Sequence, residues 1–252
     1  GEDFVVDASL IKADADRQRG VPGTEGHGSL SPTRAVREYI DVLDDAAFGG
    51  ATQVTPKFIS PADPAARWTA AQGGQAFFAY STNYLIDLDN AVIVDVEPST
   101  AIRQAEVTAT KSMLERTAQT FGLDPVRLAA NTAYGSAEML SWLVHEQGIE
   151  PHIPVFDKSA RRDGTFSRED FHYDHEGDVY VCPEGKTLRT KGTLVNDGAR
   201  DMARDIAKTD AYVVSRRQRK KVEMLFAHLK RILKLDRLRL RGPTGARDEF
   251  LL

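Results

Sequence analysis

The sequence has one cysteine, Cys182, in 252 residues. A single thiol excludes a disulfide within the chain and any metal site that needs two of its cysteines. This low cysteine usage is typical of a reducing compartment. No apolar run approaches the roughly 20 residues that span a bilayer, and no basic-then-apolar signal peptide is present. We therefore expect a cytoplasmic protein with no membrane partner.

The chain also lacks the positive net charge that is common in nucleic-acid-binding proteins, since its formal charge is −4. That charge is unevenly distributed along the sequence. Between Lys186 and Arg247 there are 18 basic and 6 acidic residues, and between Arg216 and Arg241 there are 11 basic and 2 acidic residues. Such a run can be a solvated helical face, but its length and nearly single sign favour a surface that binds phosphate.

Strand and helix patterns alternate along most of the sequence. Strand patterns cover residues 4–11, 75–87, 91–96, 126–130 and 151–156, and helical patterns cover 33–48, 101–121, 136–147 and 210–235. Alternation in the second half predicts parallel strands with right-handed crossovers, while the hairpin at 75–96 adds antiparallel strands. We expect an α/β fold: a mixed five-stranded sheet flanked by helices, in a single domain over residues 1–252. Residues 14–73 and 157–209 are expected to be insertions after the first and the fifth strand.

Three residues could carry chemistry. Asp7 interrupts an apolar strand, so its carboxylate either faces water at a sheet edge or needs a partner or a metal. Asn131 follows a short strand and precedes a tight turn, where asparagine is also a common turn-former. Glu223 is the acidic residue among the cations from Arg216 to Lys234. It can pair with a helical neighbour, or help to bind a metal beside a phosphate.

Four segments carry a resemblance to a known family. They are residues 4–13 (FVVDASLIKA), 60–67 (SPADPAAR), 128–135 (LAANTAYG) and 219–230 (RKKVEMLFAHLK). Together they resemble the catalytic domain of bacterial insertion-sequence transposases of the DDE class, which has an RNase H-like fold. The last segment is similar to the family pattern Tyr-x2-Arg-x3-Glu-x6-Lys. Arg219, Glu223 and Lys230 match it, whereas Arg216 stands at the Tyr position.

The resemblance implies a catalytic set that binds two Mg²⁺ ions and cuts and joins DNA. Asp7 and Glu223 match the first and third ligands, and Asn131 stands where the family has aspartate. A carboxamide offers one uncharged oxygen, so we expect weak metal binding at one of the two sites. We expect activity that is lowered by orders of magnitude or abolished. Three hypotheses stay open: a metal-dependent transposase, an inactive remnant that binds DNA, and an RNase H-like nuclease that acts on RNA.

Phosphate contacts are expected from basic residues on the last helix and in the second segment. These candidates are Arg67, Arg216, Arg219, Lys220, Lys221, Lys230 and Lys234. The resemblance implies DNA as the partner, both as transposon ends and as target, with homo-oligomers assembled on it in the bacterial nucleoid. We also expect that the relatives' N-terminal DNA-binding domain and zinc-bearing insertion are absent. His172, His175 and Cys182 provide three zinc ligands without a fourth, so we assign no zinc site.

Overall fold

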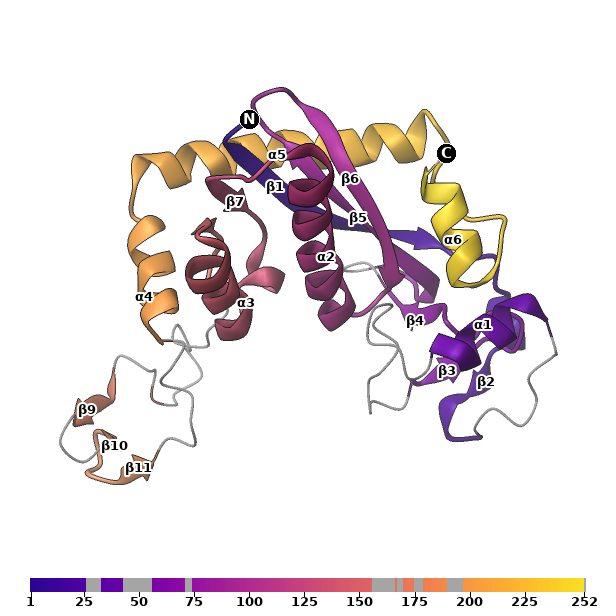
Figure 1. The fold of residues 1–252 in the computed structure, drawn as a ribbon. Helices are drawn as coiled ribbons and strands as arrows, with labels where there is room; N and C mark the ends of the chain where they lie inside the picture. The colour runs from indigo at the N-terminus through magenta and orange to yellow at the C-terminus, as the bar shows by residue number, and fades with distance from the viewer. Residues whose placement is uncertain are drawn as a thin grey trace. The chain divides into compact units, whose positions relative to one another are not determined.

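The computed structural model describes residues 1–25, 33–42, 56–70, 74–155, 166, 170–174, 179–189 and 197–251. The chain divides into two units, whose helices and strands are labelled in Figure 1. Unit 1 comprises Gly1–Val126 and Arg216–Leu252, and unit 2 comprises Arg127–Ser215.

An antiparallel sheet forms the centre of unit 1. Its strands are β1 (Asp3–Lys12), β4 (Arg67–Thr69), β5 (Phe77–Asp87) and β6 (Val92–Thr100). The long strand β5 pairs with each of the other three. Aromatic and β-branched residues favour strands, and β5 is rich in them, with ten of its eleven residues buried. The predicted hairpin at 75–96 is thereby confirmed.

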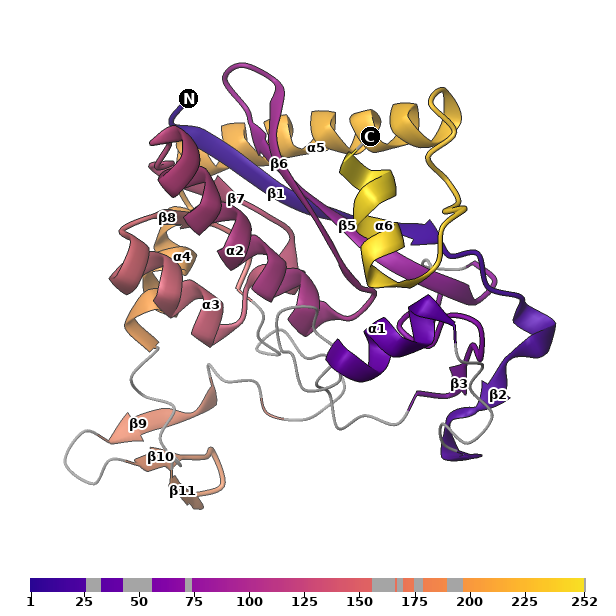
Figure 2. The same cartoon turned by 45° about the vertical axis from the view of Figure 1, so that its right-hand side comes forward.

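Helices cover both faces of this sheet. Helix α2 (Arg103–Phe121) lies on one face, and the unit 1 part of α5 (Asp210–Arg231) lies on the other (Figures 1 and 2). Gly122 ends α2 in the left-handed conformation, with φ 61°, and its N–H donates to the carbonyl of Ala118. Helix α1 (Arg34–Val42) packs against α6 (Gly242–Leu251), which also contacts β6. The short strands β2 (Val21–Pro22) and β3 (Phe58–Ile59) pair with each other.

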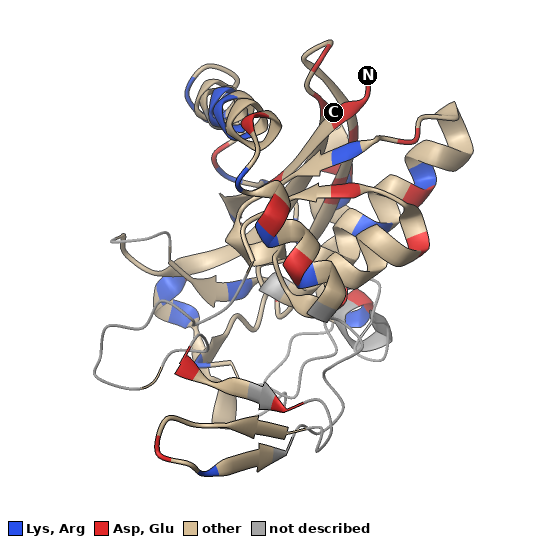
Figure 3. Cartoon of the chain, turned by 90° about the vertical axis from the view of Figure 1, so that its left-hand side faces the viewer, with Lys and Arg blue, Asp and Glu red and all other residues tan. Residues whose placement is uncertain are grey.

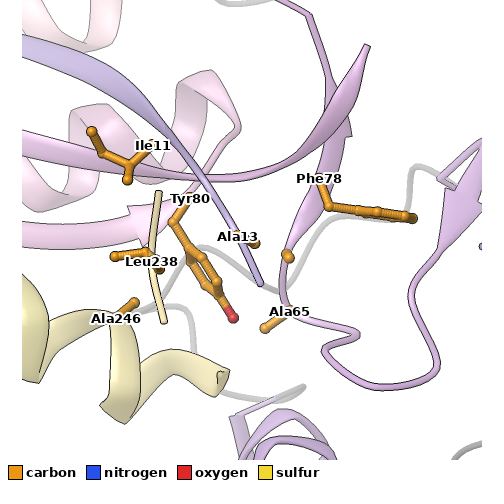
Figure 4. Close-up of a cluster of buried hydrophobic side chains, with 8 residues drawn as sticks. Ile11, Ala13, Ala65, Phe78, Tyr80, Leu238 and Ala246 are labelled. Atoms are coloured by element: carbon orange, nitrogen blue, oxygen red, sulfur yellow. The ribbon is translucent and has the colours of Figure 1, made fainter. Parts of the chain in front are cut away.

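A cluster of buried apolar side chains joins the sheet to residues 236–251, which we call the C-terminal segment. Figure 4 shows this cluster, with the Tyr80 ring between side chains of the sheet and of the C-terminal segment. Its members are Ile11, Ala13, Ala65, Ala66, Phe78, Tyr80, Leu238 and Ala246. Because Leu238 and Ala246 belong to the C-terminal segment, their burial holds this basic stretch of chain on unit 1.

Unit 2 contains a parallel pair of strands. Strand β7 (Arg127–Ala129) pairs with β8 (Glu150–His152), and α3 (Ala137–Ser141) and the π-helical turn η5 (Trp142–Gln147) connect them. The Ser136 hydroxyl accepts the Met139 N–H at 3.3 Å and so caps α3. Helix α4 (Asp197–Ile206), which the sequence patterns did not predict, packs against α3 and β8. Strands β9 (His172–Asp174), β10 (Val179–Val181) and β11 (Thr187–Arg189) form a separate small sheet.

The described strands confirm the predicted fold class. Unit 1 contributes four antiparallel strands and unit 2 a parallel pair, so both kinds of pairing are present, and helices flank the strands. Strand β4 is additional to the five predicted strands and lies within residues 14–73, predicted as an insertion. Helix α4 and the small sheet lie within 157–209, the other predicted insertion. The assignment of the whole chain to one domain stays a prediction.

Candidate metal and nucleic-acid site

Asp7 lies in the middle of β1, directly opposite Tyr84 of β5. Opposed residues of an antiparallel pair point to the same face of the sheet, so Asp7 shares a face with Tyr84. Asp7 is 8% exposed, and its Oδ1 accepts the N–H of Ala8 at 3.0 Å. Asp7 is therefore buried and does not face water at a sheet edge, which was one of the two alternatives.

Helix α5 packs on the face of the sheet that carries Asp7. The rings of Tyr84 and Phe226 lie 5.1 Å apart, and Phe226 is three residues after Glu223 on α5. One helical turn further, the Lys230 ammonium donates to the carbonyl of Leu10 on β1 at 2.8 Å. Residues three and four apart share a helix face, so Phe226 and Lys230 mark the stripe of α5 that meets the sheet. The fold therefore brings β1, which carries Asp7, and the part of α5 that carries Glu223 to one sheet–helix interface.

Asn131 lies in unit 2, immediately before the short 3₁₀-helix η4 (Thr132–Tyr134). Its Oδ1 accepts the N–H of Ala133 at 2.7 Å and caps that helix. The turn-forming role that the sequence left open is therefore confirmed. A carboxamide has only this one oxygen, whereas an aspartate could cap the helix with one oxygen and present a second to a metal.

The predicted phosphate-binding residues fall into exposed and buried groups. Arg216, Lys220, Lys221 and Lys234 are exposed, and Arg219 is half-buried. Basic residues follow one another along α5 in Figure 3. We call Arg216, Arg217, Lys220 and Lys221, all exposed, the α5 cation patch.

Two of the residues predicted to contact phosphate are buried or half-buried in unit 1. Arg67 is 8% exposed on β4, and Lys230 is half-buried against β1. Burial lowers the pKa of the Lys230 ammonium, an effect that the negative charge of Asp236 opposes. Both side chains are less exposed than those of the α5 cation patch.

Acidic residues from distant parts of the chain pair with cations of the C-terminal segment. The Asp14 carboxylate lies 3.0 Å from the guanidinium of Arg237 and 2.9 Å from that of Arg241. Glu97 pairs with Arg247 at 3.0 Å. Local sequence patterns do not predict these pairs, because none links residues more than 200 positions apart, as Asp14 and Arg241 are.

Asp63, in the second family-like segment, is fully buried and anchors the start of α6. Its Oδ1 accepts the Tyr80 hydroxyl at 2.6 Å, and its Oδ2 accepts the N–H of Gly242 at 3.1 Å. Burial raises the pKa of Asp63, against the opposing effect of these hydrogen bonds. Gly242 has φ 83°, and a Cβ there would lie 2.9 Å from the Cα of Ala35, so the junction requires glycine.

Among the side chains that the structure describes, no group of three or more His, Cys, Asp or Glu is arranged to hold a metal ion. That description does not include the side chain of Glu223. Of the three possible zinc ligands His172, His175 and Cys182, His175 lies outside the described residues. The Cys182 sulfur accepts the N–H of Lys186 at 3.3 Å.

Unit 1 has the α/β type of fold, with a buried aspartate on β1 and an acidic position on a helix that carries exposed cations. The family model described as the transposase DDE domain matches residues 2–252, so the chain belongs to that family. The family acts on DNA and normally uses a divalent metal.

The remaining comparisons add no further relative. Neither the curated proteins nor the solved structures gave a significant match to the chain. Within the described residues, every helix is too short or too polar to cross a bilayer.

Proposed function

We propose that this chain is the catalytic part of a transposase that cleaves DNA at transposon ends and joins it to a target. We further propose that Asn131 strongly limits this activity. The observation that supports the proposal most is the packing of α5, the helix of Glu223 and of the α5 cation patch, on the sheet face that carries Asp7. Membership of the transposase family supports DNA as the substrate.

The donor set of Asp7 and Glu223 fits Mg²⁺, because hard divalent cations prefer anionic oxygen ligands. Asn131 fits less well, since its one amide oxygen already accepts the N–H of Ala133 and carries no full charge. When bound, two metal ions would activate the attacking hydroxyl and stabilise the leaving oxygen of the scissile phosphodiester.

Other residues of α5 either bind the substrate or hold the helix in place. The α5 cation patch attracts backbone phosphates, which gives salt-dependent and largely sequence-independent affinity. Lys230 and Phe226 hold α5 against β1 and β5, so they position the helix that carries Glu223. We regard Lys230 as a positioning residue.

An inactive remnant that binds DNA without cutting it is the second candidate function. Asn131 favours this candidate, because its amide oxygen is used as a helix cap. Assembly as a homo-oligomer on paired DNA ends, in the nucleoid of a bacterial cytoplasm, belongs to the leading proposal.

The test compares the wild-type chain with Asn131→Asp in a plasmid-nicking assay with Mg²⁺ or Mn²⁺. The aspartate keeps the cap and adds a charged oxygen, so we expect nicking to increase about 100-fold or more. Asn131→Ser is the matched control, because serine also caps helices and adds no charge. Adding Asp7→Asn to the Asn131→Asp variant should abolish the gain.

Metal titration by calorimetry separates the two candidate functions. We expect the Asn131→Asp variant to bind two Mn²⁺ ions more tightly than the wild-type chain does. Equal and robust nicking by both proteins would show that Asn131 does not limit activity. DNA binding without nicking in either protein would favour the remnant.

A further inference from the structure

We propose that a basic cavity of unit 1 binds an unpaired nucleotide of a DNA strand, with its phosphate against arginines and its base against Phe77. The cavity measures about 580 Å³ and lies between the end of β1, the start of β5 and the C-terminal segment. The inference rests on the proposed function for its ligand, DNA. It concerns a different surface from the α5 cation patch.

Cations dominate the lining of the cavity. Five basic side chains, Lys12, Arg17, Arg19, Arg237 and Arg241, line it together with two acidic ones, Asp14 and Asp16. The cavity therefore carries an excess of three positive charges in a concave site, where the potential for an anion is strongest.

Asp14 prepares two of these cations for a phosphate. It lies within 3.0 Å of both Arg237 and Arg241, and one carboxylate cannot neutralise two guanidinium groups. Each guanidinium has five N–H donors, so holding one edge on Asp14 fixes its plane and leaves other donors for a ligand. Two such arginines beside one another are suited to the oxygens of a phosphate.

The other wall of the cavity is apolar and aromatic. Half-buried Phe77 lines it together with Ala15, Ala76 and Phe78. The Trp68 ring supports this wall edge-on to Phe78 at 5.0 Å, and the guanidinium of Arg17 lies 5.9 Å from the Trp68 ring. An aromatic side chain in a basic groove is the arrangement that stacks unpaired bases. Bases within a duplex stack on each other and offer no free face, so the combination favours an unpaired nucleotide.

The test measures fluorescence anisotropy of a labelled single-stranded 12-mer and of a labelled 20-base-pair duplex. Arg17→Gln/Arg19→Gln should weaken single-strand binding about tenfold and lower its salt slope by about 0.7 for each lost phosphate contact. Phe77→Leu keeps an apolar side chain and should weaken single-strand binding about fivefold, with the salt slope unchanged. Duplex affinity should change less than twofold in either variant.

The matched control is Lys186→Gln/Lys208→Gln, which removes two exposed cations from unit 2. It should leave single-strand affinity within twofold, and thermal unfolding should confirm that all variants are folded. An equal loss in the control, or no loss in the cavity variants, would overturn the proposal. Free thymidine monophosphate is used as a competitor. If its affinity equals that of the 12-mer per nucleotide, the proposal is overturned, because the ligand would then be a free nucleotide.

This result can be separated from that of the proposed function. Failure of Asn131→Asp to nick DNA leaves the cavity assay unaffected, since binding needs no catalysis. Conversely, nicking can increase in Asn131→Asp while the cavity variants bind single strands like the wild-type chain.

Discussion

The basic residues of unit 1 fall into two regions with different surroundings. In the α5 cation patch, the cations are exposed along one helix. In the C-terminal segment, Arg237 and Arg241 share Asp14, and Arg247 pairs with Glu97. The sequence shows one basic run, and among the described side chains the fold brings acidic residues from far along the chain to its C-terminal part. A charge sum along the sequence therefore overestimates the surface that is available to duplex DNA.

The two regions are also held by different forces. Partly exposed ion pairs contribute little, typically below about 1 kcal/mol each. The C-terminal segment is held mainly by the burial of Leu238 and Ala246 and by the hydrogen bonds of Asp63 to Tyr80 and Gly242. The comparison between the regions can be tested by weakening each one separately.

The largest effect is expected from Asp63→Ala, which removes the anchor of the C-terminal segment. The Tyr80 hydroxyl and the Gly242 N–H would lose their acceptor inside the protein, so unfolding free energy should fall by about 3 kcal/mol. Urea unfolding followed by tryptophan fluorescence measures this change. The control is Asp205→Ala, which removes an exposed carboxylate of α4 and should cost less than about 0.5 kcal/mol. A loss below about 1 kcal/mol for Asp63→Ala would mean that packing alone holds the segment.

Much of the central fold could be predicted from local patterns. Aromatic and β-branched residues of Phe77–Asp87 indicated the long strand, and Gly122 indicated the end of α2. Asp7 and Glu223 could be singled out from the sequence, because Asp7 interrupts an apolar strand and Glu223 lies among basic residues. The placement of β1 and α5, which carry them, on one interface required the contact of Tyr84 with Phe226, which no local pattern contains.

The unpredicted parts depend on partners far away in sequence. Strand β4 has three residues, too few for a periodic pattern, and exists because it pairs with β5. Arg67 lies on β4 and is buried, a feature that no local pattern indicates, and its contact with phosphate stays a prediction. Asn131 could be read either as a cap or as a ligand, and only the bond to Ala133 N–H identified the cap.

The second prediction compares the two basic regions directly. Arg216→Gln/Lys220→Gln/Lys221→Gln should weaken duplex DNA binding at least tenfold at low salt and reduce the salt slope by about 0.9 for each lost contact. Arg237→Gln/Arg241→Gln should change duplex affinity less than threefold, because Asp14 already offsets part of that charge. Filter binding across a salt series measures both. Similar losses for the two variants would contradict the distinction between the regions.

The smallest effect is expected from Asp14→Asn, which removes the carboxylate shared by Arg237 and Arg241. The Asp14 side chain is 30% exposed, and those of Arg237 and Arg241 are 56% and 48% exposed, so solvent screens both pairs. We expect unfolding free energy to fall by about 0.5–1 kcal/mol at low salt, and the difference should shrink at high salt. Asp248→Asn is the control, since it removes an exposed carboxylate from the same segment. A loss above about 2 kcal/mol that persists at high salt would show that Asp14 acts through packing rather than through its charge.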